Sequence, residues 1–123
     1  MKVLGSLEKR VMDILWVTGP LGVRQVMTQL KGKLAYTTIM TTLDRLYKKG
    51  LLARDRVGTA YIYRAVMSED DYHCSLVEDT VGSLLEKSAG PVLAAFVNTA
   101  AELDEGNLKK LEALIAQRRR RKK

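Results

Sequence analysis

The residues best suited to bond-making chemistry in this chain are its single histidine, His73, and its single cysteine, Cys74. Adjacent residues on a helix point about 100° apart, so these two side chains cannot readily form a nucleophile–base pair. With Asp70 they make a trio at i, i+3 and i+4, for which surface and packing roles are favoured over weak metal binding. The sequence also lacks a glycine-rich phosphate loop and an evident pair of catalytic carboxylates. We therefore predict no enzymatic activity, no metal site and no cofactor.

A second group of residues, between positions 37 and 59, suits contacts with nucleic acid. It combines hydroxyl groups with cations, which bind phosphate oxygens and the edges of bases. Arg45 could form two hydrogen bonds with one guanine, whereas lysines at the end of the run suit phosphates. The predicted DNA-contacting set is Thr37, Thr38, Thr41, Thr42, Arg45, Lys48, Lys49, Arg54, Arg56 and Thr59.

These side chains need a helix to position them, and the pattern from about residue 36 to Lys49 predicts one. Ile39, Leu43 and Leu46 form a single apolar stripe, and Gly50 suits the left-handed position that follows a helix end. Several β-branched residues compete with this prediction locally. The face opposite the stripe holds Thr37, Thr41, Asp44, Arg45 and Lys48, with Thr38 and Thr42 on its flank.

Two further helices are expected before this one and a β-hairpin after it. The first helix has Ser6 as its candidate N-cap and ends at Gly19–Pro20, and the second contains the apolar positions between 23 and 30. Residues 51–56 and 60–65 read as two strands around a turn at 57–59, which would place Arg54, Arg56 and Thr59 on or near the tip. Three helices and a hairpin within residues 1–66 predict a winged helix-turn-helix, a mainly α fold with a small β-hairpin wing.

The rest of the chain predicts helices that are too few to enclose a core. A capping-box pattern at 68–71 begins a helix that runs to about Ser88 and is broken by Gly90–Pro91. A helix over 92–101 and a last helix capped by Asp104 follow. We expect their apolar faces to meet in a two-fold homodimer, with packing against the first domain as the alternative. The predicted dimerisation residues are Leu76, Val77, Val81, Leu84, Leu85, Leu93, Phe96, Val97, Leu108, Leu111, Leu114 and Ile115.

Charge supports a division of the chain into three segments. Residues 1–66 carry twelve Lys and Arg against four Asp and Glu, a net +8, and residues 67–117 carry three against ten, a net −7. Residues 118–123 are all basic, and we expect them to be a disordered tail that binds DNA, balances the acidic helices or aids solubility. A charge of +8 in 66 residues favours double-stranded DNA as the partner of a DNA-binding domain at 1–66, with dimerisation at 67–117. A winged-helix protein-interaction module and a nonspecific architectural DNA-binding protein are the alternatives.

No segment of the sequence suits insertion into a membrane. The longest purely apolar run, residues 92–97, is far shorter than the ~20 residues that span a bilayer. The N-terminus has no apolar signal core, and a single cysteine excludes a disulfide framework within one chain. We therefore expect a cytoplasmic protein.

Three stretches resemble the penicillinase-repressor family of the BlaI, MecI and CopY type. They are the opening run 4–16, the run from Ala35 to Leu52, and Tyr61-Ile62-Tyr63 in the second expected strand. The resemblance covers nearly the whole chain and is strongest over residues 4–65. It implies a homodimeric bacterial transcriptional repressor that binds a palindromic operator through the third helix and the wing.

Two departures from the family pattern bear on how DNA would be released. The copper-responsive branch senses metal through several C-terminal cysteines, whereas this chain has none after Cys74. The β-lactam-responsive branch is inactivated by a regulatory protease that cuts an Asn–Phe bond. Phe96 resembles that position, but Ala95 precedes it. Cleavage before Phe96 is therefore a hypothesis in which one residue of the motif is missing.

Overall fold

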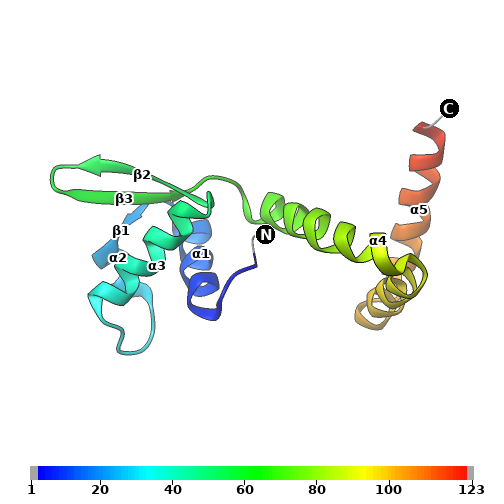
Figure 1. Cartoon of the computed structure of the whole chain (residues 1–123), viewed down its shortest axis with the longest axis horizontal. Coiled ribbons are helices and arrows are strands. Elements are labelled where there is room, and N and C mark those ends of the chain that lie inside the picture. Colours follow the sequence, from blue (N-terminus) through cyan, green and yellow to red (C-terminus); the bar gives the residue numbers. More distant parts are fainter. Residues whose placement is uncertain (1–2, 122–123) are drawn as a thin grey trace. The chain divides into compact units, whose positions relative to one another are not determined.

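The computed structural model describes residues 3–121, which divide into two units between Val77 and Glu78. The first unit holds three helices and a three-stranded antiparallel sheet, and α4 begins in it and ends in the second unit (Figure 1). This arrangement confirms the predicted winged helix-turn-helix. The elements are α1 (Ser6–Thr18), β1 (Leu21–Gly22), α2 (Val23–Gln29), α3 (Tyr36–Lys48), β2 (Leu52–Val57), β3 (Ala60–Ala65), α4 (Glu69–Leu103) and α5 (Gly106–Arg121).

The core of the first unit explains why α3 is helical despite its β-branched residues. Ile39, Leu43 and Leu46 are fully buried, and Val11 of α1 and Val26 of α2 belong to the same core. Burying one such aliphatic side chain contributes about 1.5–3 kcal/mol. A β-branched residue costs a helix at most about 0.7 kcal/mol. The apolar stripe therefore outweighs local propensity.

The wing is the hairpin β2–β3, and the sheet has one strand that we did not predict. The two wing strands pair from Leu52 with Ala65 to Val57 with Ala60. Gly58 supplies the positive φ of 64° in the turn between them. The additional strand, β1, pairs antiparallel with β3 and is only two residues long. A strand of that length is too short to show an alternating pattern in the sequence.

The first helix is capped by Gly5, which corrects our prediction that Ser6 is the N-cap. The Gly5 N–H donates to Oε1 of Glu8 at 2.9 Å, and Ser6 is the first helical residue. Lys49 Nζ lies 2.9 Å from each carboxylate oxygen of Glu8. Glu8 therefore joins the start of α1 to the end of α3.

Replacing Glu8 with glutamine should lower the free energy of unfolding by about 1–3 kcal/mol, since the carboxylate side chain is only 13% exposed. Burial alone would raise the pKa of Glu8, but hydrogen bonds from Lys49 and Gly5 lower it overall. The stabilisation is therefore complete above the ordinary pKa of 4.5 and disappears as the pH falls through the lowered value. Urea denaturation at neutral pH and at an acidic pH below the lowered pKa of Glu8 should show a large difference between wild type and Glu8→Gln only at neutral pH. A difference of equal size at both pH values would contradict this role.

The start of α4 belongs to the first unit, which moves the predicted domain boundary from 66/67 to 77/78. Tyr72 is buried, and its ring centre lies 5.5 Å from that of Trp16. Trp16 in turn donates from Nε1 to the carbonyl oxygen of Met67 at 3.0 Å. Leu76 packs against the same core, so its assignment to the dimerisation surface is corrected.

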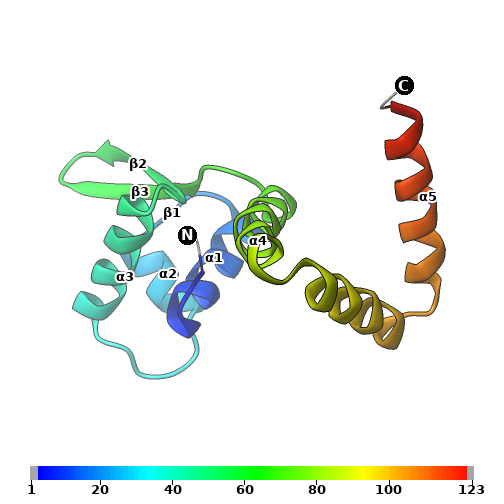
Figure 2. The ribbon, with the colours of Figure 1, turned by 45° about the vertical axis from the view of Figure 1, so that its right-hand side comes forward.

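The break in α4 lies at Ser88, slightly before the predicted position at Gly90–Pro91. Ser88 has non-helical backbone angles (φ −146°, ψ 54°), and α4 is visibly kinked in its yellow-green part (Figure 2). Helical backbone resumes directly afterwards, so Pro91 falls in the first turn after the break. A proline costs no intrahelical hydrogen bond there, because the first N–H groups of a helix have no partner.

The last helix continues to Arg121, so the predicted disordered tail is wrong for residues 118–121. Arginine is a good helix former, and cations are stabilised at the C-terminal end of a helix by its dipole. Residues 122 and 123 of that predicted tail lie outside the described residues. Within residues 3–121, no helix combines the length and the apolar character needed to cross a membrane.

Candidate nucleic-acid interface

The exposed face of α3 brings together five of the predicted DNA-contacting side chains. Thr37, Thr38, Thr41, Arg45 and Lys48 are all exposed there, on the side of the helix away from the buried stripe. A helix about 10–12 Å wide fits the major groove of B-DNA, which is about 12 Å wide. This face therefore offers hydroxyl groups and cations in a form that can enter that groove.

Thr42 does not lie on this face. Its side chain is 5% exposed, and its hydroxyl donates to the carbonyl oxygen of Thr38 at 2.8 Å. Thr42 follows Ile39 by three positions and precedes Leu46 by four, so it shares the buried side of the helix. We therefore remove Thr42 from the predicted contacts.

One flank of the α3 face borders an open groove that α3 shares with the start of α1. Ser6, Thr38 and Arg45 line this groove together with Glu8. A guanidinium group beside two hydroxyl groups suits a phosphate or a base edge. Lys49 lies nearby, but its ammonium group is held by Glu8 and its side chain is 35% exposed. The structure thus gives Lys49 a structural partner that the sequence did not suggest.

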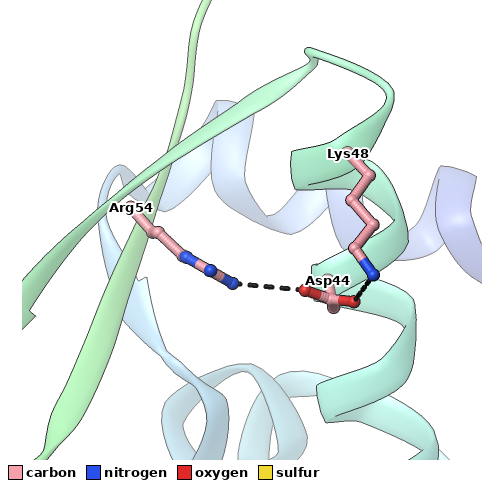
Figure 3. Close-up of polar contacts among 3 residues, drawn as sticks. All are labelled: Asp44, Lys48 and Arg54. Atoms are coloured by element: carbon pink, nitrogen blue, oxygen red, sulfur yellow. Dashed lines mark hydrogen bonds and ion pairs between the residues drawn. The ribbon is translucent and has the colours of Figure 1, made fainter.

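On the other flank of the α3 face, the wing packs against the helix through Arg54. The guanidinium carbon of Arg54 lies 4.0 Å from the ring centre of Tyr47 and 4.3 Å from that of Tyr61. Its Nη1 also donates to Oδ1 of Asp44 at 3.2 Å (Figure 3). Arg54 pairs with Tyr63 within the hairpin, which corrects the prediction that it lies on or near the wing tip. These contacts make Arg54 a link between the wing and α3.

Asp44 is a site residue that sequence reasoning placed on the α3 face but left out of the predicted contacts. Lys48 Nζ lies 3.0 Å from its Oδ2, while Arg54 approaches Oδ1 (Figure 3). Hydrogen bonds from Lys48 and Arg54 hold the pKa of Asp44 below its ordinary value, so the group is an ionised carboxylate at neutral pH. The spacing of Asp44 and Lys48 was a visible signal for their ion pair. The contact with Arg54 depends on the placement of the hairpin, which the sequence does not show.

The wing tip carries the other two predicted residues, Arg56 and Thr59, and both are exposed. Arg56 pairs with Tyr61 across the hairpin, and its Nε donates to the carbonyl oxygen of Gly58 at 3.2 Å. A narrow hairpin tip with an arginine suits a phosphate backbone or a minor groove next to the site of α3.

The second unit presents an apolar groove where α4 and α5 meet. Phe96, Leu103, Leu111 and Leu114 line it, and Phe96 is 46% and Leu114 60% exposed. The turn between the helices is fixed by Asn107, whose Nδ2 donates to the carbonyl oxygen of Ala100 at 2.9 Å. The other predicted dimerisation residues of α4 and α5 are half-buried or exposed, namely Val77, Val81, Leu84, Leu85, Leu93, Val97, Leu108 and Ile115.

The trio that we weighed as a weak metal site is not assembled in the structure. His73 Nε2 lies 3.9 Å from a carboxylate oxygen of Glu69, and Cys74 is exposed. In the stretch from residue 3 to residue 121, no three His, Cys, Asp or Glu side chains are placed to hold one metal ion.

Comparison with known sequences finds transcriptional regulators and penicillinase repressors among the relatives of this chain. A family model described as penicillinase repressor matches residues 4–117. The chain is 41% identical to the transcriptional regulator BlaI of Mycobacterium tuberculosis over 98 residues, which cover 77% of this chain and 70% of that protein. It is 27% identical to a penicillinase repressor of Staphylococcus aureus over 113 residues, covering 90% and 86% of the two chains.

Comparison with solved structures supports the same fold. The chain superimposes on the solution structure of the DNA-binding domain of the repressor BlaI with a TM-score of 0.51 and 30% identity. That match covers 56% of this chain and 87% of the domain. A MarR family protein from Bacillus stearothermophilus matches with a TM-score of 0.50 at 20% identity, over 92% of this chain and 76% of the other. The second match shows a shared fold only.

Proposed function

The chain belongs to the penicillinase repressor family, and on that premise we propose that it is a homodimeric repressor that binds a palindromic operator. The observation that carries this proposal is the α3 face, where Thr37, Thr41, Arg45 and Lys48 project from a strongly basic winged helix. In the proposed complex, α3 occupies the major groove of a half-site and the wing tip lies against the neighbouring backbone. Repression follows from occupying the promoter, which would place the protein in the cytoplasm.

The proposed dimer is supported by the second unit. No residue of α5 is buried, and Tyr72 is the one buried residue of α4 among the described residues. Helices that leave groups as large as Phe96 and Leu114 in water gain stability when another apolar surface covers them. A second copy offers a self-complementary surface of this kind. It also places two winged helices on one operator, which can raise the overall affinity by about 10²- to 10⁴-fold.

Selection from a library of random DNA duplexes with the full chain tests this function. We expect an enriched inverted repeat whose half-sites are spaced by about 10–10.5 base pairs or a multiple of it. Enrichment of a single half-site would contradict binding as a dimer. Tight binding without any enriched sequence would indicate an architectural protein, and a lack of binding at moderate salt would indicate a protein-interaction module.

Release of DNA in this proposal follows from loss of the dimer. Cleavage of the Ala95–Phe96 bond by a regulatory protease would separate the winged helix from α5 and from every residue that lines the apolar groove. The Phe96 side chain is 46% exposed in the second half of α4. The chain can be treated with its cognate protease or taken from induced cells. Mass spectrometry of either sample should then show a fragment that begins at Phe96. A chain that stays intact under both conditions would contradict this route.

The last turn of α5 adds a second basic surface to the proposed repressor. Arg118, Arg119, Arg120 and Arg121 follow one another at steps of about 100°, so their charges surround the helix. We expect them to contact DNA phosphates, each of which contributes about 0.9 to the slope of log affinity against log salt. Replacing all four with glutamine should flatten that slope when fluorescence anisotropy is measured between about 50 and 200 mM salt. An unchanged slope would assign the arginines to solubility or to balancing the acidic helices.

A further inference from the structure

Asp44 lies where the proposed repressor would meet its DNA. It follows Thr37 by seven residues, almost two full turns, so the two side chains share the exposed face of α3. Its side chain is 36% exposed, which leaves part of the carboxylate open to a ligand. A negative charge at this place is unfavourable against a polyanion unless the carboxylate receives a hydrogen bond there.

Neighbouring side chains fix the orientation of this carboxylate. Each of its oxygens has one donor, Lys48 Nζ at 3.0 Å on Oδ2 and Arg54 Nη1 at 3.2 Å on Oδ1 (Figure 3). Arg54 is itself held against the rings of Tyr47 and Tyr61. An ionised carboxylate accepts about four hydrogen bonds and donates none. Asp44 is therefore a pre-oriented acceptor with capacity left for a ligand.

Resting on the proposed function, we propose that Asp44 is a specificity-determining residue that accepts a hydrogen bond from the N4 amino group of a cytosine. In the major groove only cytosine and adenine offer amino donors, whereas guanine and thymine present acceptor oxygens that repel a carboxylate. Adenine places its N7 acceptor beside the amino group, which suits an amide better than a carboxylate. Cytosine presents the donor without that acceptor, so it is the base that Asp44 recognises.

The competing role for Asp44 is to anchor the wing through Arg54. The two roles differ in what they do to sequence preference. Loss of a base contact changes the preference at one base pair of each half-site. Loss of a wing anchor weakens binding to every sequence alike and should be reproduced by Arg54→Gln, which leaves the Asp44 carboxylate in place.

The test is to select duplexes from a random library with four full-length proteins: wild type, Asp44→Asn, Asp44→Ala and Arg54→Gln. We expect one cytosine of the wild-type half-site to become adenine with Asp44→Asn, because an asparagine amide pairs with adenine N6 and N7. Asp44→Ala should lose the preference at that position, and Arg54→Gln should keep it, because Lys48 still holds the carboxylate. Binding titrations should show that changing this cytosine costs wild type about 5- to 150-fold in affinity but costs Asp44→Ala almost nothing.

One outcome would contradict the inference about Asp44, and a different outcome would contradict the proposed function. If wild type and both Asp44 variants enrich the same base at every position, the inference is wrong while the proposed function stands. If wild type enriches no sequence, the proposed function fails and takes the inference with it. Circular dichroism of the variants checks that they remain folded, and Asp44→Asn preserves the shape of the side chain.

Discussion

Replacing Leu114 with aspartate is expected to make the protein monomeric and to weaken operator binding by about 10²- to 10⁴-fold. Leu114 lies in the apolar groove, and its side chain is 60% exposed. In the proposed dimer a carboxylate at this position would be covered by a second chain, and removing it from water costs several kcal/mol. Each monomer would then bind a single half-site without help from a second. Light scattering after size-exclusion chromatography measures the mass, and anisotropy titration measures the affinity.

Ala116→Asp is the matched control for this variant. It introduces the same charge into the same helix, but about 200° around the helix axis from Leu114, where the side chain is exposed. We expect this variant to remain dimeric and to bind the operator with nearly wild-type affinity. A dimeric Leu114→Asp protein with unchanged operator affinity would show that this groove is not the dimer interface.

Arg45→Ala is expected to weaken binding to the operator by about 5- to 150-fold, with little change on random DNA. Arg45 is exposed on α3 and lines the groove beside the start of α1. A guanidinium group there can donate two hydrogen bonds to O6 and N7 of one guanine, a contact worth about 1–3 kcal/mol of discrimination. Titration of the operator and of a scrambled duplex at one salt concentration compares the two losses.

Arg64→Ala is the matched control for Arg45→Ala, because it also removes one arginine but from β3 and not from α3. Arg64 lies on β3, where its Nε donates to Oδ2 of Asp55 at 3.2 Å. We expect this substitution to produce a small loss that is equal on both duplexes. If Arg45→Ala also lost affinity equally on the operator and on scrambled DNA, its contact would be with phosphate and the proposed base reading would be wrong.

The fold could be predicted from the sequence where a pattern repeats within one element. Ile39, Leu43 and Leu46 specified α3 because a stripe of three buried residues outweighs local β propensity. β1 could not be predicted, since its two residues form a strand only through pairing with β3. The start of α4 was also assigned to the other unit, because the contact of Tyr72 in its first turn with Trp16 joins residues far apart in the sequence.

For the candidate site, the sequence predicted which side chains of α3 are exposed but not which contacts they make with other elements. Stepping by 100° along α3 placed Thr41 and Arg45 on the exposed side, because exposure of a helix face depends on its own stripe. It did not reveal that Lys49 is held by Glu8, or that Arg54 is held by side chains of α3 and β3. Those contacts join residues from different elements, and only the folded arrangement determines them.

Because α5 has no buried residues, we expect the fraction of operator that is occupied to depend steeply on the concentration of the proposed repressor. Helices whose apolar side chains are buried only against a second chain are stabilised by dimerisation, so their stability depends on protein concentration. The concentration of a dimer varies with the square of the free monomer concentration. A modest fall in the synthesis of the protein would therefore lower operator occupancy by a larger factor than it lowers the protein concentration. Expression of the repressed gene would then rise steeply over a narrow range of repressor concentration.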